Sequence, residues 1–236
     1  MSSIIAENLG IIRARIDDAC RRVGRDPSEV RLVGVTKTVP ASHIREGVQA
    51  GITILGENYI QEARAKVEAL GDLGISWHFI GHLQSNKAKI AVECCDMVHT
   101  VDRESLALEL DRQAKRAGRV VPVLIQVNVG DESTKSGTSP EALPGIFRVV
   151  SELEGLAVRG LMALPPYEED PEKARPYFRM LRELLEGLKR DAPKPGDLRE
   201  LSMGMSHDFE VAVEEGATLV RIGTALFGER APRNPA

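Results

Sequence analysis

The chain has 236 residues, of which 42% are hydrophobic and 28% charged, and its formal net charge is −4. This composition is typical of a globular protein that buries its apolar surface without disulfides. The net negative charge and the low aromatic content of 4% argue against nucleic-acid binding. No apolar run approaches the roughly 20 residues that span a membrane, and charges interrupt the N-terminal segment too often for a signal peptide. We expect no nucleic acid and no membrane among the partners.

The first predicted element is a helix over residues 2–24, with an apolar side formed by Ile4, Ile5, Leu9, Ile12 and Ile16. Short apolar runs typical of strands follow at 31–36, 53–55, 77–80, 97–100, 121–129, 156–162, 200–203 and 218–223. Amphipathic helices are predicted between these strands at 41–50, 57–70, 84–93, 103–117, 140–152, 171–189 and 207–215, and a short last helix begins near Thr224.

Strands that alternate with helices indicate parallel pairing through right-handed crossovers. Eight such units within about 200 residues predict an α/β protein with a single (β/α)8 TIM barrel, at about 30–228, preceded by the extra helix. We expect one domain over residues 1–236, because no linker or repeat interrupts the alternation. A doubly wound open sheet is the alternative, but the segment after the first strand reads "TKTVP" where that fold usually carries glycines.

Polar and glycine-rich residues follow the predicted strands at the end where barrel enzymes keep their chemistry. Lys37 follows the first strand and Asn58 the second, while Arg221 lies near the end of the eighth. A lone lysine past a strand is usually just solvated. Its agreement in position with the other polar strand ends favours a functional site.

The loops after strands seven and eight are the usual phosphate site of this fold. "SMGMSHDFE" (202–210) supplies Gly204, Ser206 and a helix start, and "RIGTALFG" (221–228) supplies Gly223 and Thr224 at another. Backbone N–H groups at such helix starts bind anions. The alternative is that Ser206 merely caps the helix that follows it.

Strand eight neighbours strand one in a closed barrel, so the predicted phosphate loops lie beside Lys37. A partly desolvated lysine can form a Schiff base with an aldehyde. Pyridoxal 5′-phosphate (PLP) carries both an aldehyde and a phosphate, and would link Lys37 to the loops. Arg221 would then lie under the pyridine ring. A guanidinium keeps its proton, so the ring nitrogen would stay unprotonated and PLP would be a weaker electron sink.

The segments "VGVTKTVP", "GENYIQE", "WHFIGHLQSNK", "IQVNVGDESTKSG", "RGLMALPP" and "LSMGMSHDFEVAVEEGATLVRIGTALFG" resemble the pyridoxal phosphate homeostasis protein family. The resemblance runs from about residue 30 to residue 228. It implies a fold-type III PLP barrel related to the N-terminal domain of alanine racemase, with PLP held covalently on Lys37. It further implies Arg221 at the pyridine nitrogen, Asn58 beside the ring, Ser206, Gly223 and Thr224 on the phosphate, and Met203 and Gly204 shaping the same loop.

The resemblance implies a PLP carrier rather than a catalyst, so we assign no catalytic residue. Alanine racemase needs a second domain that brings a tyrosine to the cofactor, and nothing marks Tyr167 as that base. The expected role is intracellular PLP homeostasis, by buffering PLP or delivering it to apo PLP-dependent enzymes. A small fold-type III enzyme such as an amino-acid racemase is the alternative, and a regulatory PLP-dependent interaction is a third. We expect a monomer or weak dimer.

The remaining reactive residues give weaker signals. Cys20, Cys94 and Cys95 fit neither a disulfide framework nor a zinc site, which favours a reduced, cytoplasmic protein, with the vicinal pair packing at a helix end. The histidines lack metal-binding spacing, so no metal is expected. His78 reads as a satisfied core residue. His82 and Lys135 are minor candidates for the barrel mouth, Lys135 as a second, transient PLP acceptor.

Overall fold

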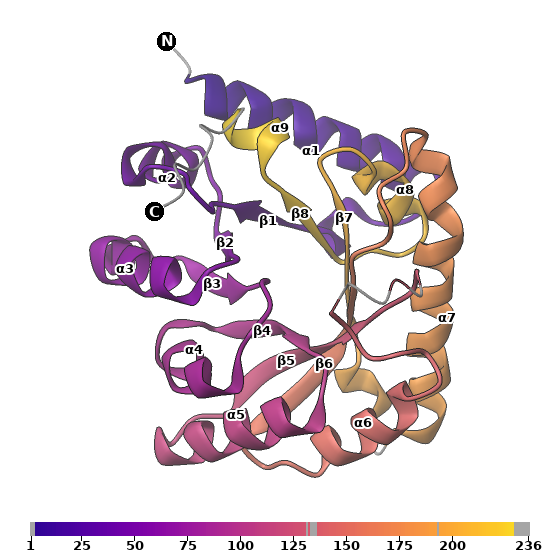
Figure 1. Ribbon diagram of the computed structural model, residues 1–236. Coiled ribbons are helices and arrows are strands. Elements are labelled where there is room, and N and C mark those ends of the chain that lie inside the picture. The colour runs from indigo at the N-terminus through magenta and orange to yellow at the C-terminus, as the bar shows by residue number, and fades with distance from the viewer. Residues whose placement is uncertain (1–2, 131, 133–135, 193, 229–236) are drawn as a thin grey trace.

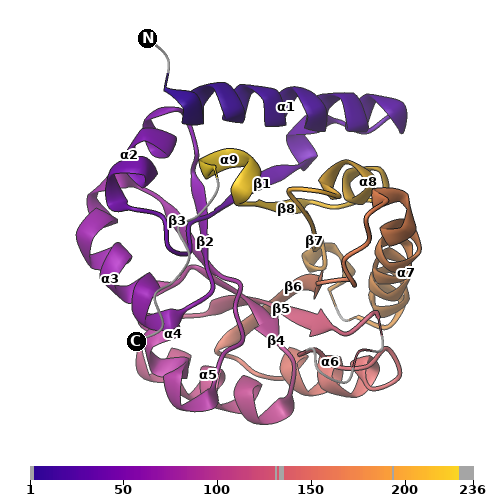
Figure 2. The same cartoon turned by 45° about the horizontal axis from the view of Figure 1, so that its top comes forward.

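The computed structural model of the chain describes residues 3–130, 132, 136–192 and 194–228. Its eight parallel strands form a closed barrel in which each strand pairs with its neighbours in the chain and β8 pairs with β1 (Figure 2). The strands are β1 (Arg31–Val35), β2 (Ile54–Glu57), β3 (Ser76–Phe79), β4 (Met97–Val101), β5 (Val121–Val127), β6 (Leu156–Ala163), β7 (Glu200–Met205) and β8 (Leu219–Ile222). The predicted TIM barrel is confirmed.

Helices surround the barrel on its outer side (Figure 1). They are α1 (Ile4–Arg22), α2 (Ala41–Gln49), α3 (Ile60–Leu70), α4 (Ala88–Cys94), α5 (Glu104–Arg116), α6 (Leu143–Ser151), α7 (Arg175–Asp191), α8 (Phe209–Glu214) and α9 (Thr224–Phe227). Each predicted helix corresponds to one of these, with ends that differ by a few residues. Cys94 ends α4 and Cys95 is buried directly after it, as expected for a pair that packs at a helix end.

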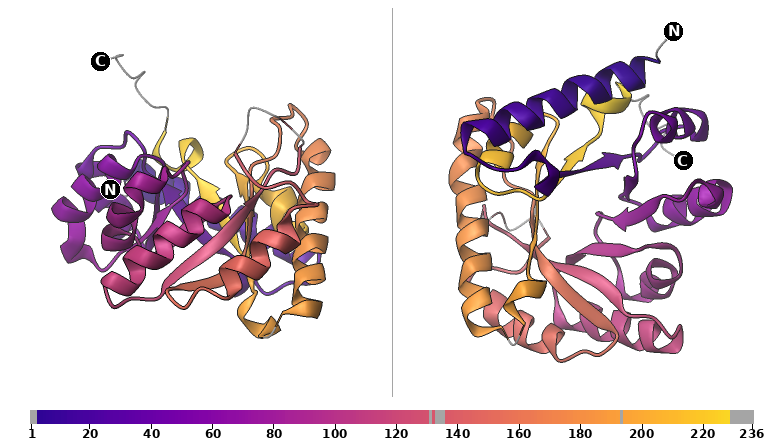
Figure 3. Two further views of the ribbon diagram at one scale, coloured as in Figure 1. Left: turned by 60° about the horizontal axis from the view of Figure 1, so that its bottom comes forward. Right: turned by 180° about the vertical axis from the view of Figure 1, so that it is seen from behind.

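The extra N-terminal helix lies across α8 and α9, and so covers the junction between the end of the barrel and its beginning (Figure 3). Its apolar side buries Ile5, Leu9, Ile12 and Ile16, as predicted. The inclusion of Ile4 in that side was wrong, because its side chain is 67% exposed. Ile4 precedes Ile5 by one residue, which turns it about 100° away from the buried stripe.

The barrel interior is apolar toward the amino ends of the strands and polar toward their carboxyl ends. The apolar part is a cluster of inward-facing side chains, Val33, Ile54, Met97, Leu124, Met162 and Leu219. Since side chains alternate along a strand, the residues two and four positions further on from these face the same interior. This alternation brings polar side chains of several strands together toward the carboxyl ends.

None of the helices in the described part of the chain combines the length and the hydropathy that a membrane span requires.

Candidate cofactor site

Lys37 lies just past the end of β1 and is partly buried. Val33 belongs to the interior cluster, and alternation puts Val35 and Lys37 on the same inward side. Pairing with β2 continues past the end of β1, because the Thr36 N–H donates to the Gly56 carbonyl at 3.0 Å. The strand therefore carries its regular geometry up to the residue before the lysine.

Asn58 takes the corresponding place on the neighbouring strand. It is four residues past the inward-facing Ile54 and is partly buried, directly after β2. The backbone after β3 passes very close to it, because a Cβ added to Gly81 would lie 2.0 Å from the Asn58 carbonyl oxygen. Only glycine fits at this crossing. The structure thus places Lys37 and Asn58 on adjacent strand ends of the mouth.

Arg221 is the buried cation of the barrel interior, with 3% of its surface exposed. It pairs in register with Val33 of β1, four residues before Lys37. Its guanidinium donates to the Ser202 hydroxyl at 2.8 Å and to the Ala163 carbonyl at 2.9 Å. Burial lowers the pKa of Arg221 to about 10, an effect that the negative charge of Asp208 opposes. Arg221 therefore remains protonated at neutral pH.

A chain of hydrogen bonds extends from Arg221 through two buried histidines. Ser202 Oγ lies 2.9 Å from His99 Nδ1, and His99 Nε2 lies 2.9 Å from His78 Nδ1. Burial lowers the pKa of His78 to about 3 and that of His99 well below its usual value, so both rings are neutral. An arginine can only donate, which favours a single direction of donation from Arg221 through Ser202 and His99 to His78.

The far end of this chain is Ser76, whose hydroxyl lies 3.2 Å from His78 Nε2. The expectation that His78 is a satisfied core residue is confirmed. His99 was not predicted as a contributor, and Ser202 was predicted only as one of the two serine hydroxyls of "SMGMSHDFE"; they lie in the predicted strands at 97–100 and 200–203. Inward alternation along each strand is the signal that could have identified them.

The loop between β7 and α8 turns sharply toward the start of α9. Gly204 has φ +86°, and a Cβ there would lie 2.6 Å from the Ala212 side chain. The Met205 N–H donates to the buried Asp208 carboxylate at 2.6 Å, which holds the turn. Burial raises the pKa of Asp208. Gly204 and Asp208 together fix the direction in which the loop presents Ser206.

Ser206 points across to the other loop rather than capping the helix that follows it. Its hydroxyl oxygen accepts from the N–H groups of Gly223 and Ala225, at 3.4 and 3.3 Å. The N-cap residue of α8 is instead Asp208. The capping alternative for Ser206 is therefore wrong. Two backbone N–H groups at the start of α9 converge on one oxygen through long bonds, a geometry suited to an anion's oxygen.

The other predicted residues of this region differ in their exposure to solvent. Gly223 is buried at the end of β8, and Thr224, the first residue of α9, is exposed beside it. Met203 lies in the outer core cluster that packs between barrel and helices, so only its backbone can shape the loop. The structure brings Ser206, Gly223 and Thr224 together on the β7–β8 side of the mouth.

Two further residues considered for the mouth, Tyr167 and the minor candidate His82, lie on its rim. Tyr167 is 75% exposed and packs against His207, with ring centroids 5.4 Å apart. His82 follows β3, and its Nδ1 lies 3.0 Å from the Ser136 hydroxyl. Lys135 falls outside the described residues.

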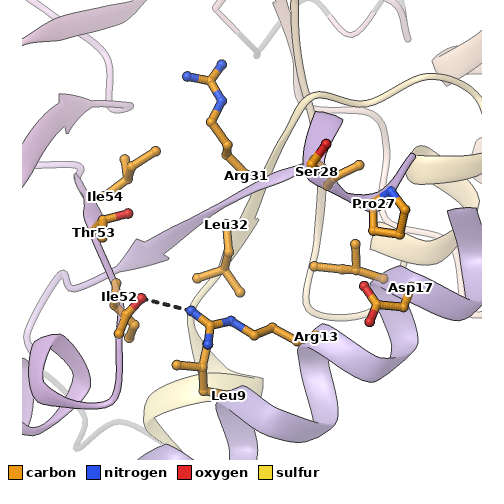
Figure 4. Close-up of a pocket in the computed structure, with 13 residues that line it drawn as sticks. Leu9, Arg13, Asp17, Pro27, Ser28, Arg31, Leu32, Ile52, Thr53 and Ile54 are labelled. Atoms are coloured by element: carbon orange, nitrogen blue, oxygen red, sulfur yellow. Dashed lines mark hydrogen bonds between the residues drawn. The ribbon is translucent and has the colours of Figure 1, made fainter. Parts of the chain in front are cut away.

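A separate cavity of about 380 Å³ lies at the opposite end of the barrel, beneath the starts of β1 and β2 (Figure 4). Leu9 and Arg13 of α1 contribute to it, and Arg13 donates to the Gly51 carbonyl at 2.8 Å. None of the eight predicted site residues lines this cavity. Its position at the amino ends of the strands does not correspond to the predicted site.

Comparison with known proteins identifies the family of the chain. Residues 8–231 match the family model for the alanine racemase N-terminal domain. A pyridoxal phosphate homeostasis protein of Aquifex aeolicus is 51% identical over 224 residues, covering 95% of this chain and 97% of its own. The chain belongs to the pyridoxal phosphate homeostasis protein family.

A second relative of the same name, from Escherichia coli K12, is 43% identical over 229 residues and covers 96% of this chain and 97% of its own. Among solved structures, PipY of Synechococcus elongatus PCC7942 with PLP bound has a TM-score of 0.83 and 39% identity, covering 95% of this chain and 100% of its own. An alanine racemase of Clostridium difficile, at 14% identity and a TM-score of 0.69, shares the barrel fold.

Proposed function

We propose that this protein binds PLP at the carboxyl ends of its barrel strands and serves PLP homeostasis inside the cell. Lys37 holds the cofactor covalently as a Schiff base. Ser206, Gly223, Thr224 and the neighbouring backbone N–H groups bind its phosphate. Its roles are buffering PLP or delivering it to apo PLP-dependent enzymes, without robust catalysis of its own.

The observation that carries this proposal is the arrangement of two cations and an anion cradle on three successive strands of the closed barrel. Lys37 and Arg221 come from the paired strands β1 and β8, and the converging N–H groups of Gly223 and Ala225 follow β8. When bound, PLP supplies an aldehyde that reacts with amines and a ring that accepts electron density.

Arg221 supports a carrier because it limits that electron acceptance. The guanidinium stays protonated, and a ring nitrogen that accepts a hydrogen bond from it remains unprotonated. The exposed ring of Tyr167 lies against His207 on the rim, and nothing marks it as a second acid or base for the cofactor. Asn58, beside Lys37 on the next strand end, suits a contact with the ring substituents.

The surroundings in which this chemistry operates belong to the same proposal. Three cysteines, none of them disulfide-bonded, suit a reduced cytoplasm. Apo PLP-dependent enzymes are the acceptors we expect, and a monomer or weak dimer leaves the barrel mouth open to them. Met203 and Gly204 contribute by shaping the loop that carries Ser206.

The test is the absorption spectrum of the purified protein with PLP, followed by borohydride reduction and peptide mapping. We expect a yellow protein and a reduced cofactor on Lys37. A Lys37→Ala variant should still bind PLP in equilibrium dialysis, without the visible band, because the cradle does not require the lysine. A label found only on another lysine would contradict the assignment. Racemisation of added amino acids by the wild type would favour an enzyme instead.

A further inference from the structure

The backbone around Lys37 contains an unusual conformation. Thr38, the next residue, has φ +62°, and in the part of the chain that the structure describes it is the only non-glycine residue in the left-handed region. A β-branched residue is strongly disfavoured there. Strained residues of this kind persist only where surrounding contacts hold them, and they cluster at functional sites.

The contact that holds Thr38 comes from α3. The N–H of Thr38 donates to the Glu62 carboxylate at 2.6 Å. The same carboxylate oxygen accepts from Lys66 Nζ at 2.8 Å, one helical turn further along α3. The peptide group that follows Lys37 is therefore fixed by a side chain which is itself fixed by Lys66.

Lys66 also holds the peptide group that precedes Lys37. Its ammonium donates to the Thr36 carbonyl oxygen and, at 2.7 Å, to the Glu57 carboxylate. Glu57 in turn accepts from the Thr36 hydroxyl at 2.6 Å. With the bond to Glu62, these contacts use the three donors of the ammonium group.

Glu57 shows why this arrangement is specific rather than a surface ion pair. Its side chain is 1% exposed, and burial raises its pKa while Lys66 opposes that shift. A buried carboxylate is tolerated only when it is paired and hydrogen-bonded. Lys66, also largely buried, is the pairing group. We call Glu57, Glu62 and Lys66 the Lys66 clamp.

We propose that Glu62 and Lys66 are positioning residues for Lys37: by holding the peptide groups on both sides of it, they present its amine to the cofactor aldehyde. The proposal rests on the proposed function, since it assigns a role in PLP attachment. Both residues contact the backbone on either side of Lys37, so they act on the attachment through the lysine. Orientation of a reacting amine is a large factor in rate, because small displacements reduce productive encounters.

The test compares two substitutions of one residue. Glu62→Ala removes the acceptor for the Thr38 N–H, whereas Glu62→Gln keeps an acceptor oxygen. Glu68→Ala is the matched control, because Glu68 pairs with Arg64 at 2.9 Å on the same helix but is 65% exposed. Two quantities are measured for each protein. They are the rate at which the visible band of lysine-bound PLP appears, and the total PLP bound at equilibrium.

We expect Glu62→Ala to slow attachment by about tenfold while total PLP binding stays within about twofold of the wild type. Glu62→Gln and Glu68→Ala should attach PLP at rates close to wild type. Amide hydrogen exchange at Thr38 in PLP-free protein should be faster in Glu62→Ala alone. Lys66→Met should slow attachment further if it folds, but the Glu62 variants decide the question without it.

Three results would overturn the proposal. They are attachment by Glu62→Ala at the wild-type rate, equal slowing in Glu62→Ala and Glu68→Ala, or a loss of total PLP binding in step with the slower attachment. Failure of the proposed function looks different. In that case the wild type itself would give no band with PLP, or Lys37→Ala would keep it, whatever the exchange at Thr38 shows.

Discussion

The two sides of the barrel mouth are built from different materials. On the β1–β2 side, Lys37 is presented by a strained turn that the buried charges of the Lys66 clamp hold from outside the barrel. On the β7–β8 side, the proposed anion cradle consists of backbone N–H groups, a serine hydroxyl and glycines. The geometry of the first side depends on charged side chains at particular positions. The geometry of the second side depends on the path of the backbone.

This difference indicates which side of the mouth tolerates amino-acid substitutions. Backbone N–H groups keep their direction as long as the strands and helices fold, so the β7–β8 side is fixed by the barrel itself. The β1–β2 side needs particular charges at particular positions, so a single substitution disturbs it. In the proposed function a carrier would benefit from this division, since a covalent bond to Lys37 could break while the phosphate stayed held.

The largest expected effect tests whether the β7–β8 side provides most of the affinity. Pyridoxal, which lacks the phosphate, should bind the wild type about 3 kcal/mol more weakly than PLP, or roughly 100-fold, from two charged hydrogen bonds of about 1.5 kcal/mol each. A Ser206→Ala, Thr224→Ala double variant should lose PLP affinity by about 1.5 kcal/mol per lost bond, and in total no more than the loss of the phosphate. Equilibrium dialysis of both ligands measures this.

The control for that experiment is pyridoxal binding to the double variant, which should equal pyridoxal binding to the wild type. If the wild type held PLP and pyridoxal equally well, the phosphate cradle would not exist and the two sides would not differ as described.

A second test measures the folding stability at low pH. It shows how much the two neutral histidines beneath the mouth contribute to the stability of the barrel that carries both sides. His78 has a pKa of about 3 in the folded protein against 6.5 in the unfolded chain, so the unfolded chain binds the extra proton between these values. Stability should therefore fall as pH falls from about 6.5 toward 3. One histidine accounts for about 2 kcal/mol between pH 7 and pH 5. His99 acts in the same direction.

Urea unfolding at pH 7 and pH 5 measures how steeply the free energy of unfolding falls with falling pH. His78→Asn should flatten this slope, because the variant lacks the group that the unfolded chain protonates. His43→Asn, at an exposed position on α2, is the matched control and should leave the slope as it is. An equal slope in His78→Asn and wild type would mean that the ring is not held neutral.

The smallest expected effect lies at Arg221, between the two sides. Arg221→Glu places a carboxyl beside the ring nitrogen, which would then share its proton, so the visible absorption of bound PLP should change and affinity should fall by about tenfold. Arg221→Lys keeps the cation and should shift the spectrum less. Absorption titration with PLP compares the three proteins. An unchanged spectrum and affinity in Arg221→Glu would place Arg221 away from the ring.

The sequence predicts the fold and the positions of the strand-end residues well, for a physical reason. A buried parallel strand is a short apolar run, and a polar residue at its end marks the mouth. "RLVGVT" corresponds to β1 and is followed by Lys37, while "TLVRIG" contains β8 and precedes Thr224. These signals are local, so they survive without any knowledge of tertiary contacts.

The Lys66 clamp and the histidine chain could not be predicted in this way. Glu62 and Lys66 have the same i,i+4 spacing as Arg64 and Glu68, yet the first pair is largely shielded from solvent and the second pair is exposed. His99 meets Ser202 across 103 positions of the chain. Ser206 satisfied two interpretations equally, since a helix cap and an anion ligand use the same oxygen. Each case depends on which elements meet in space.

The junction covered by α1 has a consequence for the order of assembly. Asn8 of α1 donates to the Leu226 carbonyl of α9, 218 positions later, and β1 completes its pairing only when β8 arrives. During synthesis the apolar side of α1 therefore stays exposed until α8 and α9, made almost a whole chain later, can pack against it. Contacts so distant in sequence form slowly. The start of α9 carries the Gly223 and Ala225 N–H groups of the proposed phosphate cradle. With PLP bound as proposed, cofactor capture would require that the first and last parts of the barrel have met, so a half-made chain would not sequester PLP.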